Sequence, residues 1–319
     1  MAKNIAILTS GGDAPGMNTV VRAVTYAAIN KGFNVYGVYD GYKGLYENNI
    51  KPLTKEIVDF YANLGGTFMR TARLPEFKNQ EVRKVAIDNL KANNIDSLIV
   101  IGGDGSYMGA KKLSEEGIST IAIPGTIDND ISSSDLTIGF DTALNAIVEA
   151  IDRIKDTGRS HSRCMVVEVM GNRCDDLAIY SGVAVGADFV MSKNHPVDIS
   201  VICKDLKAKK EAGQNFALVI VSERLFNLDE IVKAIATETG WDTRGSVLGH
   251  IQRGGSPTAM ERVNATRMGY YAVQLLTQGI TGVCVGLKNG ELVHEDIYSA
   301  LKKETYVSPE LISILDNLK

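Results

Sequence analysis

Three short segments of this sequence place aspartate among glycines directly after runs of apolar residues. They are GGD at 11–13, GGDGS at 102–106 and GTIDND at 125–130. Glycine lets backbone N–H groups approach phosphate oxygens, and the N-terminus of a following helix favours negative charge. A carboxylate beside a phosphate would repel it unless a divalent cation lay between them, and Mg²⁺ prefers oxygen ligands. Together the segments predict a phosphate site with bound Mg²⁺.

One such turn alone is weak evidence, because Gly and Asp are ordinary turn residues after any strand. Three of them, one with two aspartates around an asparagine, are harder to explain as loop chemistry. The sequence has no GxxxxGK[ST] segment, which excludes a P-loop nucleotide site. It also has no GxGxxG after the first apolar run, which weakens a dinucleotide-binding interpretation.

The apolar runs alternate with segments of helical periodicity, a pattern typical of an α/β fold. We expect strands at 5–9, 35–39, 97–101, 121–124, 165–169, 216–221 and 246–248, and helices at 17–31, 141–156 and 175–185. This order predicts two Rossmann-like lobes with mostly parallel sheets, divided near residues 139–142. Ligands of such sheets bind outside the carboxyl ends of the strands, so the three turns should meet in one crevice.

Composition narrows the class of protein further. The 319 residues are 45% hydrophobic and 23% charged, as in an ordinary globular protein, and the net charge of −4 argues against a nucleic-acid partner. No apolar run is long enough to cross a membrane, and the first residues lack a signal-peptide pattern. The four scattered cysteines have no metal-binding spacing, so we expect reduced thiols in a cytoplasmic protein.

Six segments resemble one enzyme family in the family's own order. They are LTSGGDAPGMN (8–18), IGGDGS (101–106), PGTIDND (124–130), TIGFDTA (137–143), VVEVMG (166–171) and VLGHIQRGGSPT (247–258). They closely resemble bacterial-type ATP-dependent 6-phosphofructokinase. The resemblance implies phosphorylation of fructose 6-phosphate at its 1-hydroxyl by ATP, giving fructose 1,6-bisphosphate in glycolysis. Its fold would be phosphofructokinase-like, with an ATP and Mg²⁺ lobe at 1–139 and part of 251–301, and a sugar-phosphate lobe at 140–250 and 302–319.

The same resemblance assigns roles at the three turns. Asp128 would be the general base for the 1-hydroxyl, Asp130 would support that arrangement, and Thr126 would lie near the transferring group. Asp104 would be the Mg²⁺ ligand. The residues implied to hold ATP, with Arg73 also near the reacting phosphate, are Gly11, Arg73, Gly102, Gly103, Asp104, Gly105 and Ser106.

For the sugar phosphate, the resemblance implies a second set of residues. The 6-phosphate would be bound by Arg163, Arg244, His250 and Arg253, and the sugar would be contacted by Met170, Gly171 and Glu223. In this family the equivalents of Arg163 and Arg244 reach across from a neighbouring subunit, so a homotetramer with shared substrate sites is expected. Relatives that use pyrophosphate carry Asp and Lys where this chain has Gly105 and Gly125, which favours ATP as the donor.

The sequence departs from the family pattern after the strand at 165–169. Asn172 stands where a positively charged residue is usual, and Asp175 where a small neutral residue is usual. Arg173 could supply the missing charge from the next position, and Asp175 could cap the following helix. The alternative is weaker binding of the sugar phosphate, or lost catalysis.

The effector pocket of the family is also altered. Arg22, Lys55, Lys155 and Asp188 preserve its charges, but Tyr26, Ala212 and Gln214 stand where cations are typical. Because a diphosphate needs several charge-assisted bonds, we expect weak or absent regulation by ADP or phosphoenolpyruvate. Two other functions stay open at this point: a tagatose 6-phosphate kinase, and a non-catalytic paralogue that binds nucleotide or sugar phosphate.

Overall fold

The chain forms two compact α/β units in a computed structural model that describes residues 3–172, 174–302 and 308–317. One unit comprises Met1–Thr142 with Arg253–Thr305, and the other comprises Ala143–Gln252 with Tyr306–Lys319. The chain therefore leaves the first unit after Thr142, three residues beyond the limit expected from the sequence, and re-enters it at Arg253. No helix in the described part of the chain is long and apolar enough to cross a membrane.

The first unit is built on a mostly parallel sheet. Within the described residues its strands run in the order β12-β11-β5-β4-β1-β2-β3, with β6 beside β5. Only the two edge strands, β3 and β12, run antiparallel to their neighbours. The strands are β1 (Asn4–Thr9), β2 (Asn34–Val38), β3 (Ile50–Pro52), β4 (Ser97–Gly102), β5 (Ser119–Thr126), β6 (Ile138–Gly139), β11 (Val283–Lys288) and β12 (Glu291–Asp296).

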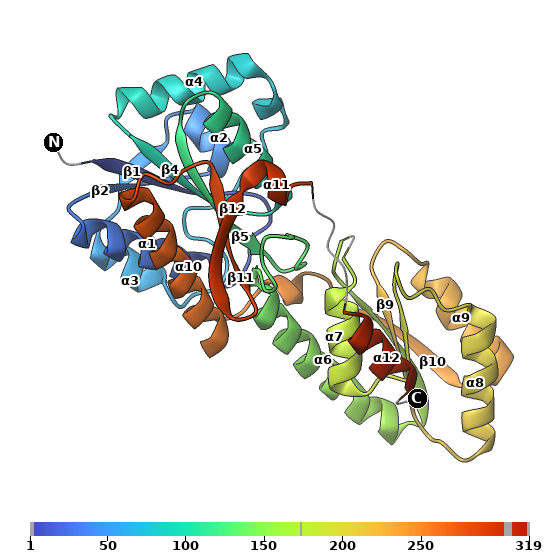
Figure 1. Cartoon of the computed structure of the whole chain (residues 1–319). Coiled ribbons are helices and arrows are strands. Elements are labelled where there is room, and N and C mark those ends of the chain that lie inside the picture. Colours follow the sequence, from blue (N-terminus) through green and yellow to red (C-terminus); the bar gives the residue numbers. More distant parts are fainter. Residues whose placement is uncertain (1–2, 173, 303–307, 318–319) are drawn as a thin grey trace. The chain divides into compact units, whose positions relative to one another are not determined.

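Helices cover both faces of this sheet. In Figure 1, α1, α3 and α10 lie on one face and α2, α4 and α5 on the other. The helices of this unit are α1 (Met17–Asn30), α2 (Gly41–Tyr46), α3 (Lys55–Tyr61), the 3₁₀ helix η1 (Pro75–Lys78), α4 (Gln80–Ala92), α5 (Asp104–Glu115), α10 (Ala259–Thr277) and α11 (Ile297–Ala300). Because both faces are covered, the central strands are apolar along their whole length, and β4 is buried from Leu98 onward.

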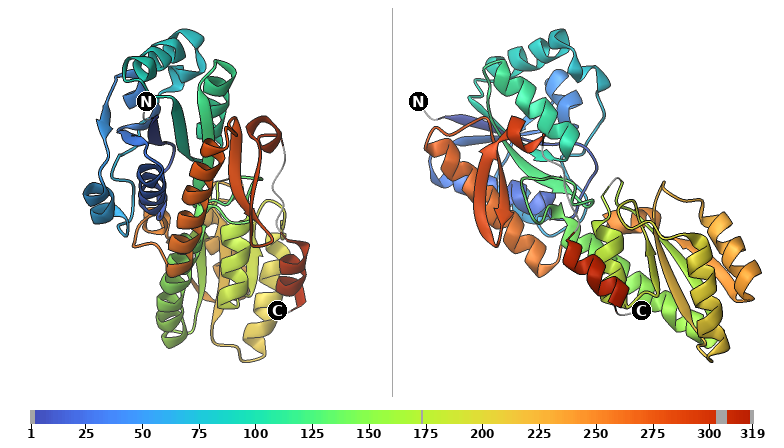
Figure 2. Two further views of the ribbon diagram at one scale, coloured as in Figure 1. Left: turned by 60° about the vertical axis from the view of Figure 1, so that its left-hand side comes forward. Right: turned by 45° about the vertical axis from the view of Figure 1, so that its right-hand side comes forward.

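The second unit has a smaller sheet in the order β10-β7-β9-β8, all parallel among the described residues. Its strands are β7 (Arg163–Val169), β8 (Phe189–Met191), β9 (Ala217–Ser222) and β10 (Asp242–Val247). Its helices are α6 (Phe140–Ser160), α7 (Asp176–Val185), α8 (Ile199–Glu211), α9 (Leu228–Thr239), the 3₁₀ helix η2 (Gly249–Arg253) and α12 (Pro309–Asn317). The first residues of α6 and the last residue of η2 belong to the first unit. Figure 2 shows helices on both faces of this sheet from two further directions.

The predicted fold class, α/β with mostly parallel sheets, is confirmed. Each predicted strand and helix is present, with ends displaced by a few residues. The largest difference is β10, which spans Asp242–Val247 and not 246–248. It is an edge strand in which Asp242, Arg244, Gly245 and Val247 are exposed, so the segment is not a continuous apolar run.

A buried carboxylate joins the two segments of the first unit near the points where the chain leaves and returns. Glu261 of α10 is 2% exposed, and it accepts hydrogen bonds from the backbone N–H and the hydroxyl of Thr142, at 3.2 and 3.1 Å. Thr258, which caps α10, donates its hydroxyl to Asp141. Burial, the largest influence, raises the pKa of Glu261 to about 7, against the lowering effect of hydrogen bonds from Gly139 and Thr142.

This shift predicts that replacing Glu261 with Gln flattens the dependence of stability on pH. The ordinary pKa of the group is 4.5. Between pH 4.5 and 7 the folded protein therefore holds a proton that the unfolded chain has released, so stability falls as pH rises through this window. The expected fall is about 3 kcal/mol, and Glu261→Gln should lack it.

Denaturant unfolding of both proteins at pH 5 and pH 7.5 measures this difference. Glu238→Gln, at an exposed position of α9, is the matched control and should keep the wild-type pH dependence. The assignment is wrong if Glu261→Gln and the wild type lose the same stability between the two pH values.

Candidate active site

The three glycine and aspartate turns follow three neighbouring parallel strands of the first unit. β4 lies between β1 and β5, with Thr9 opposite Ile101 and Ile101 opposite Ile123. The carboxyl ends of the three strands are therefore level. This register places the segments 10–13, 102–106 and 125–130 at the same edge of the sheet.

The first two turns are packed so tightly that glycine is required. Ser10 donates its backbone N–H to the carbonyl of Ile101 at 3.0 Å, which ties the two turns together. A Cβ on Gly102 would lie 2.4 Å from the Ser10 carbonyl oxygen, closer than any real contact. A Cβ on Gly11, where φ is +87°, would lie 3.4 Å from Ser106 Oγ and 3.9 Å from the Gly103 nitrogen. Backbone N–H groups are thus gathered at the start of α5.

The third turn brings carboxylates to the same place. Asp104 stands in the first turn of α5, and burial together with the charge of Asp130 raises its pKa to about 6. A Cβ on Gly103 would lie 3.9 Å from the Cβ of Thr126, so the second and third turns are also in contact. Asp128 is buried, two residues along from Thr126. The structure thus brings Asp104 and Asp130 close enough to interact, and Asp128 lies on the same loop as Asp130.

The loop that carries Asp128 is held by its own hydrogen bonds. Asn129, which has a left-handed backbone at φ +54°, donates to the Asp135 carbonyl at 3.0 Å and accepts from the Thr137 N–H at 2.8 Å. Thr137 in turn donates its hydroxyl to the Thr126 carbonyl at 2.7 Å. The Asp128 N–H donates to the Thr126 hydroxyl at 3.1 Å. These bonds fix the backbone on both sides of the Asp128 carboxylate.

Arg253 and Arg73, two predicted site residues of the first unit, have different surroundings. Arg253 donates to the Asp13 carbonyl at 3.2 Å, and its guanidinium fills the space where a side chain on Gly12 would stand. It therefore lies against the first glycine turn. Arg73 is exposed, three residues beyond Arg70, whose carbonyl accepts a hydrogen bond from the hydroxyl at the end of β1.

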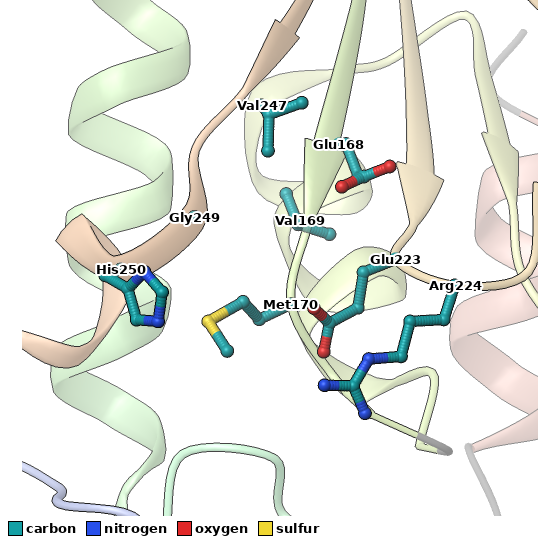
Figure 3. A pocket seen from close by; sticks show the side chains of 8 residues that line it. All are labelled: Glu168, Val169, Met170, Glu223, Arg224, Val247, Gly249 and His250. Carbon is teal, nitrogen blue, oxygen red and sulfur yellow. The ribbon is translucent and has the colours of Figure 1, made fainter. Parts of the chain in front are cut away.

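In the second unit, a pocket of about 140 Å³ opens at the carboxyl ends of β7, β9 and β10. Its lining residues are Glu168, Val169, Met170, Glu223, Arg224, Val247, Gly249 and His250. Figure 3 shows Met170 between His250 on one side and Glu223 with Arg224 on the other. Burial and the charge of Glu223 raise the pKa of Glu168. Three residues predicted to contact the sugar phosphate, Met170, Glu223 and His250, thus share one pocket.

The segment after β7 borders this pocket. Gly171 has φ +148°, and a Cβ there would lie 2.5 Å from the Cys174 carbonyl oxygen, so only glycine fits. Asn172 donates its N–H to Glu223 at 3.2 Å and accepts from the Arg224 guanidinium at 3.3 Å. Arg173, suggested above as a substitute cation, lies outside the described residues.

The expectation that Asp175 caps α7 is wrong. Asp175 stands at the N-cap position, but its side chain makes no capping hydrogen bond within the described part of the chain. Its buried carboxylate instead accepts hydrogen bonds from the backbone N–H groups of Lys193 and Asn194, at 3.0 and 2.7 Å. The acidic residue therefore fixes the loop after β8 and does not face the pocket as an extra free charge.

Arg163 and Arg244 lie at the opposite ends of the strands from this pocket. Arg163 begins β7, and its guanidinium bonds Asp242 at 2.7 Å. Arg244 on β10 bonds the other oxygen of Asp242 at 3.0 Å. Of the four predicted 6-phosphate binders, His250 lines this pocket, and Arg163 and Arg244 lie toward the other end of the same sheet. Arg253 lies in the first unit, against the first glycine turn.

The predicted effector residues are engaged with neighbours inside each unit. Arg22 bonds Asp59 at 2.6 Å, Tyr26 donates to the same carboxylate, and Lys55 lies 4.8 Å from the centre of the Tyr26 ring. In the second unit, Lys155 donates to the Val185 carbonyl at 2.9 Å. There Asp188 accepts from Lys209 at 2.8 Å and from Gln214 at 3.2 Å. The charged side chains of the predicted effector site are therefore already bonded to groups of the protein itself.

Sequence reasoning missed Asn129, Glu168 and Arg224. In the sequence, Asn129 stood out only as the residue between Asp128 and Asp130. Its left-handed backbone conformation could not be predicted, because Asn only tolerates that conformation more readily than most residues. Glu168 lies inside the VVEVMG segment and Arg224 directly follows Glu223. Adjacency to matched residues was the only signal that could have marked them.

Comparison with known proteins identifies the family. The family model described as Phosphofructokinase matches residues 4–276. The chain belongs to the phosphofructokinase family. The ATP-dependent 6-phosphofructokinase of Teredinibacter turnerae is 51% identical over 302 residues, which cover 95% of this chain and 94% of the relative. That of Photobacterium profundum is 49% identical over 319 residues, covering both chains completely.

A solved phosphofructokinase structure has the same fold. The enzyme from Saccharomyces cerevisiae superposes with a TM-score of 0.87 at 34% identity, covering 99% of this chain. This chain spans about half of that longer polypeptide, at 47% of its length. The phosphofructokinase architecture therefore accounts for both units described above.

The position of Asn129 predicts that Asn129→Ala lowers both stability and turnover. The substitution removes two hydrogen bonds and places alanine in a left-handed backbone, a loss of about 2–4 kcal/mol in the free energy of unfolding. Asn94→Ala is the matched control, because Asn94 has a similar φ of +52° but is exposed, in the turn between α4 and β4. Denaturant unfolding and the turnover number measure the two effects. Equal effects of the two substitutions would contradict the role assigned to Asn129.

Proposed function

We propose that this chain is an ATP-dependent 6-phosphofructokinase, which transfers the terminal phosphoryl group of ATP to the 1-hydroxyl of fructose 6-phosphate. The observation that carries the proposal is the meeting of three strand ends that gather backbone N–H groups and the carboxylates of Asp104, Asp128 and Asp130. Relatives about half identical in sequence over nearly their whole length, named for this activity, support it. ATP and a sugar phosphate are both anionic. Backbone N–H groups and arginine side chains are suited to bind such ligands.

In this mechanism Asp128 accepts the proton of the 1-hydroxyl as that oxygen attacks the terminal phosphorus. The buried carboxylate needs only hydrogen-bond reach to the hydroxyl, and the Thr126 to Thr137 bonds hold it in place. Phosphoryl transfer asks the protein mainly for alignment and for positive charge around the phosphate oxygens. The N–H groups at the start of α5 and the Arg73 guanidinium would supply the alignment and part of the charge.

Asp104 of the second turn and Asp130 of the third turn fit a magnesium ion. Burial, and after it the charge of Asp130, raises the pKa of Asp104 to about 6, so a cation at Asp104 would stabilise its ionised form. No cluster of three or more metal-binding side chains occurs among the described residues. That suits Mg²⁺, which is usually held by one or two carboxylates together with substrate phosphates and water. Asp104 would hold the ion, which would neutralise charge on the transferring phosphate.

The sugar phosphate site is assigned to the pocket of the second unit. Met170, Gly171 and Glu223 would contact the sugar, and His250 and Arg253 would contact the 6-phosphate. Arg163 and Arg244 are held by Asp242 at the other ends of the strands, which supports the expectation that they serve a neighbouring subunit in a homotetramer. The four cysteines are buried, which fits reduced thiols in a cytoplasmic protein.

The donor is assigned from the glycine positions. At Gly105 a Cβ would meet nothing within 4 Å, so the space beside Asp104 is open for a nucleotide phosphate. At Gly125 a Cβ would lie 2.8 Å from the Met17 methyl group and 3.0 Å from Ile101. A side chain at 125 would therefore press on these neighbours, so glycine suits the packing of this turn.

The function predicts that Asp128→Asn abolishes turnover while the protein stays folded. A coupled assay with ATP, Mg²⁺ and fructose 6-phosphate should show wild-type activity, and the variant should lose about a hundredfold to ten-thousandfold in kcat. Asp135→Asn, at an exposed position of the same loop, is the control and should retain activity. An inactive wild type, or an Asp128→Asn variant with normal kcat, would refute the proposal; the same assay with pyrophosphate tests the donor.

The effector site predicts that ADP and phosphoenolpyruvate leave the initial rate unchanged at subsaturating fructose 6-phosphate. Asp59 already neutralises Arg22, and Tyr26 offers no charge to a phosphate, so few charge-assisted bonds remain available. Steady-state assays across a range of effector concentrations give the measurement. Saturable activation by ADP or inhibition by phosphoenolpyruvate would show that the site is intact.

A further inference from the structure

The pocket of the second unit has two carboxylates and one permanent cation. Among the eight residues that line it, all of them described, Glu168 and Glu223 are acidic and Arg224 alone is positively charged at every physiological pH. Burial and like charge raise the pKa of Glu168, which reflects the cost of an uncompensated negative charge. An anionic ligand cannot be bound there unless a cation balances the carboxylates.

The backbone of Arg224 is held in an uncommon conformation. Its φ is +63°, in the left-handed region that Gly and Asn adopt more easily than a bulky residue. Such conformations persist where the surrounding structure imposes them, and they cluster at ligand sites. Here the hydrogen bond from the Glu223 N–H to the Val169 carbonyl, 2.9 Å long, fixes the preceding residue at the end of β9. Arg224 is thereby turned toward the pocket and not along the strand.

The guanidinium is also aimed by a partner. It donates to the Asn172 side chain at 3.3 Å, and the Asn172 backbone N–H donates to Glu223 at 3.2 Å. Figure 3 shows the Arg224 and Glu223 side chains next to each other on one side of Met170. One N–H of the guanidinium is used by Asn172, and the planar fork has further donors that suit the oxygens of a phosphate.

We propose that Arg224 is a substrate-binding residue, whose guanidinium supplies the positive charge that Asn172 does not carry and contacts an anionic oxygen of the sugar phosphate. The inference rests on the proposed function, since it takes a phosphorylated sugar as the ligand of this pocket. It explains how the chain can bind that ligand with a neutral residue at 172. Arg224 would supply the compensating charge for which Arg173 was suggested above.

The test compares Arg224→Gln with the wild type in the coupled assay and in direct binding of fructose 6-phosphate by calorimetry. The variant should raise the KM and the Kd for fructose 6-phosphate by about tenfold to a hundredfold and leave the KM for ATP unchanged. Arg224→Lys should lose less, because it keeps the charge without the fork. Arg153→Gln, which removes an exposed guanidinium on α6, is the control and should change neither constant.

A double variant that moves the positive charge to position 172 separates a role of Arg224 in ligand binding from a structural role. Asn172→Arg combined with Arg224→Gln moves the guanidinium to the neighbouring position and should restore most of the lost affinity. Unchanged affinity in Arg224→Gln overturns the inference while leaving the proposed function intact. Affinity that the double variant does not recover would assign Arg224 a structural role instead, and an inactive wild type would refute the proposed function itself.

Discussion

The parallel pairing of β1, β4 and β5 is the constraint on which the candidate site depends. Because Thr9, Ile101 and Ile123 stand side by side across the three strands, the chain leaves the sheet at one level three times in succession. Each exit then needs a turn that leaves room for the other two. The clash that any side chain on Gly102 would make with Ser10 shows how little room there is. Glycine is therefore demanded at 102 by packing and at 11 by a left-handed backbone.

The acidic residues differ from the glycines, because they lower the stability of the protein when no ligand is bound. Burial is the larger cause of the raised pKa of Asp104 and of Glu168, and the charges of Asp130 and Glu223 raise these pKa values further. Fold stability gives no reason to keep like charges together at the carboxyl ends of strands. A ligand that brings cations, or the nearby guanidinium groups, resolves both repulsions. The two units thus follow one electrostatic pattern, with carboxylates set beside the groups that compensate them.

The sequence predicted the central strands well because both faces of the main sheet are covered, which makes β1, β4 and β5 continuous apolar runs. It predicted β10 poorly because this edge strand is mostly exposed, and because it is polar or glycine from Asp242 to Ser246. The three turns could be read directly, since glycine and aspartate are adjacent in the chain. Contacts such as Arg163 with Asp242, 79 residues apart, had no local signal.

Backbone conformation was the other feature beyond reach of the sequence. Nothing in SERL distinguishes an arginine with φ +63° from an ordinary surface arginine, and nothing around Asp175 shows that its carboxylate turns to the loop at 193–194. Both outcomes depend on residues that approach from elsewhere in the fold. They also bear on the same segment, 170–175, where the chain departs from its family.

A crystal structure of the protein with Mg²⁺ and a non-hydrolysable ATP analogue tests the central claim most directly. The account predicts the metal on the Asp104 carboxylate, the phosphates against the N–H groups at the start of α5, and the terminal phosphate beside Asp128. A triphosphate bound away from the three strand ends, or a metal without contact to Asp104, would contradict it.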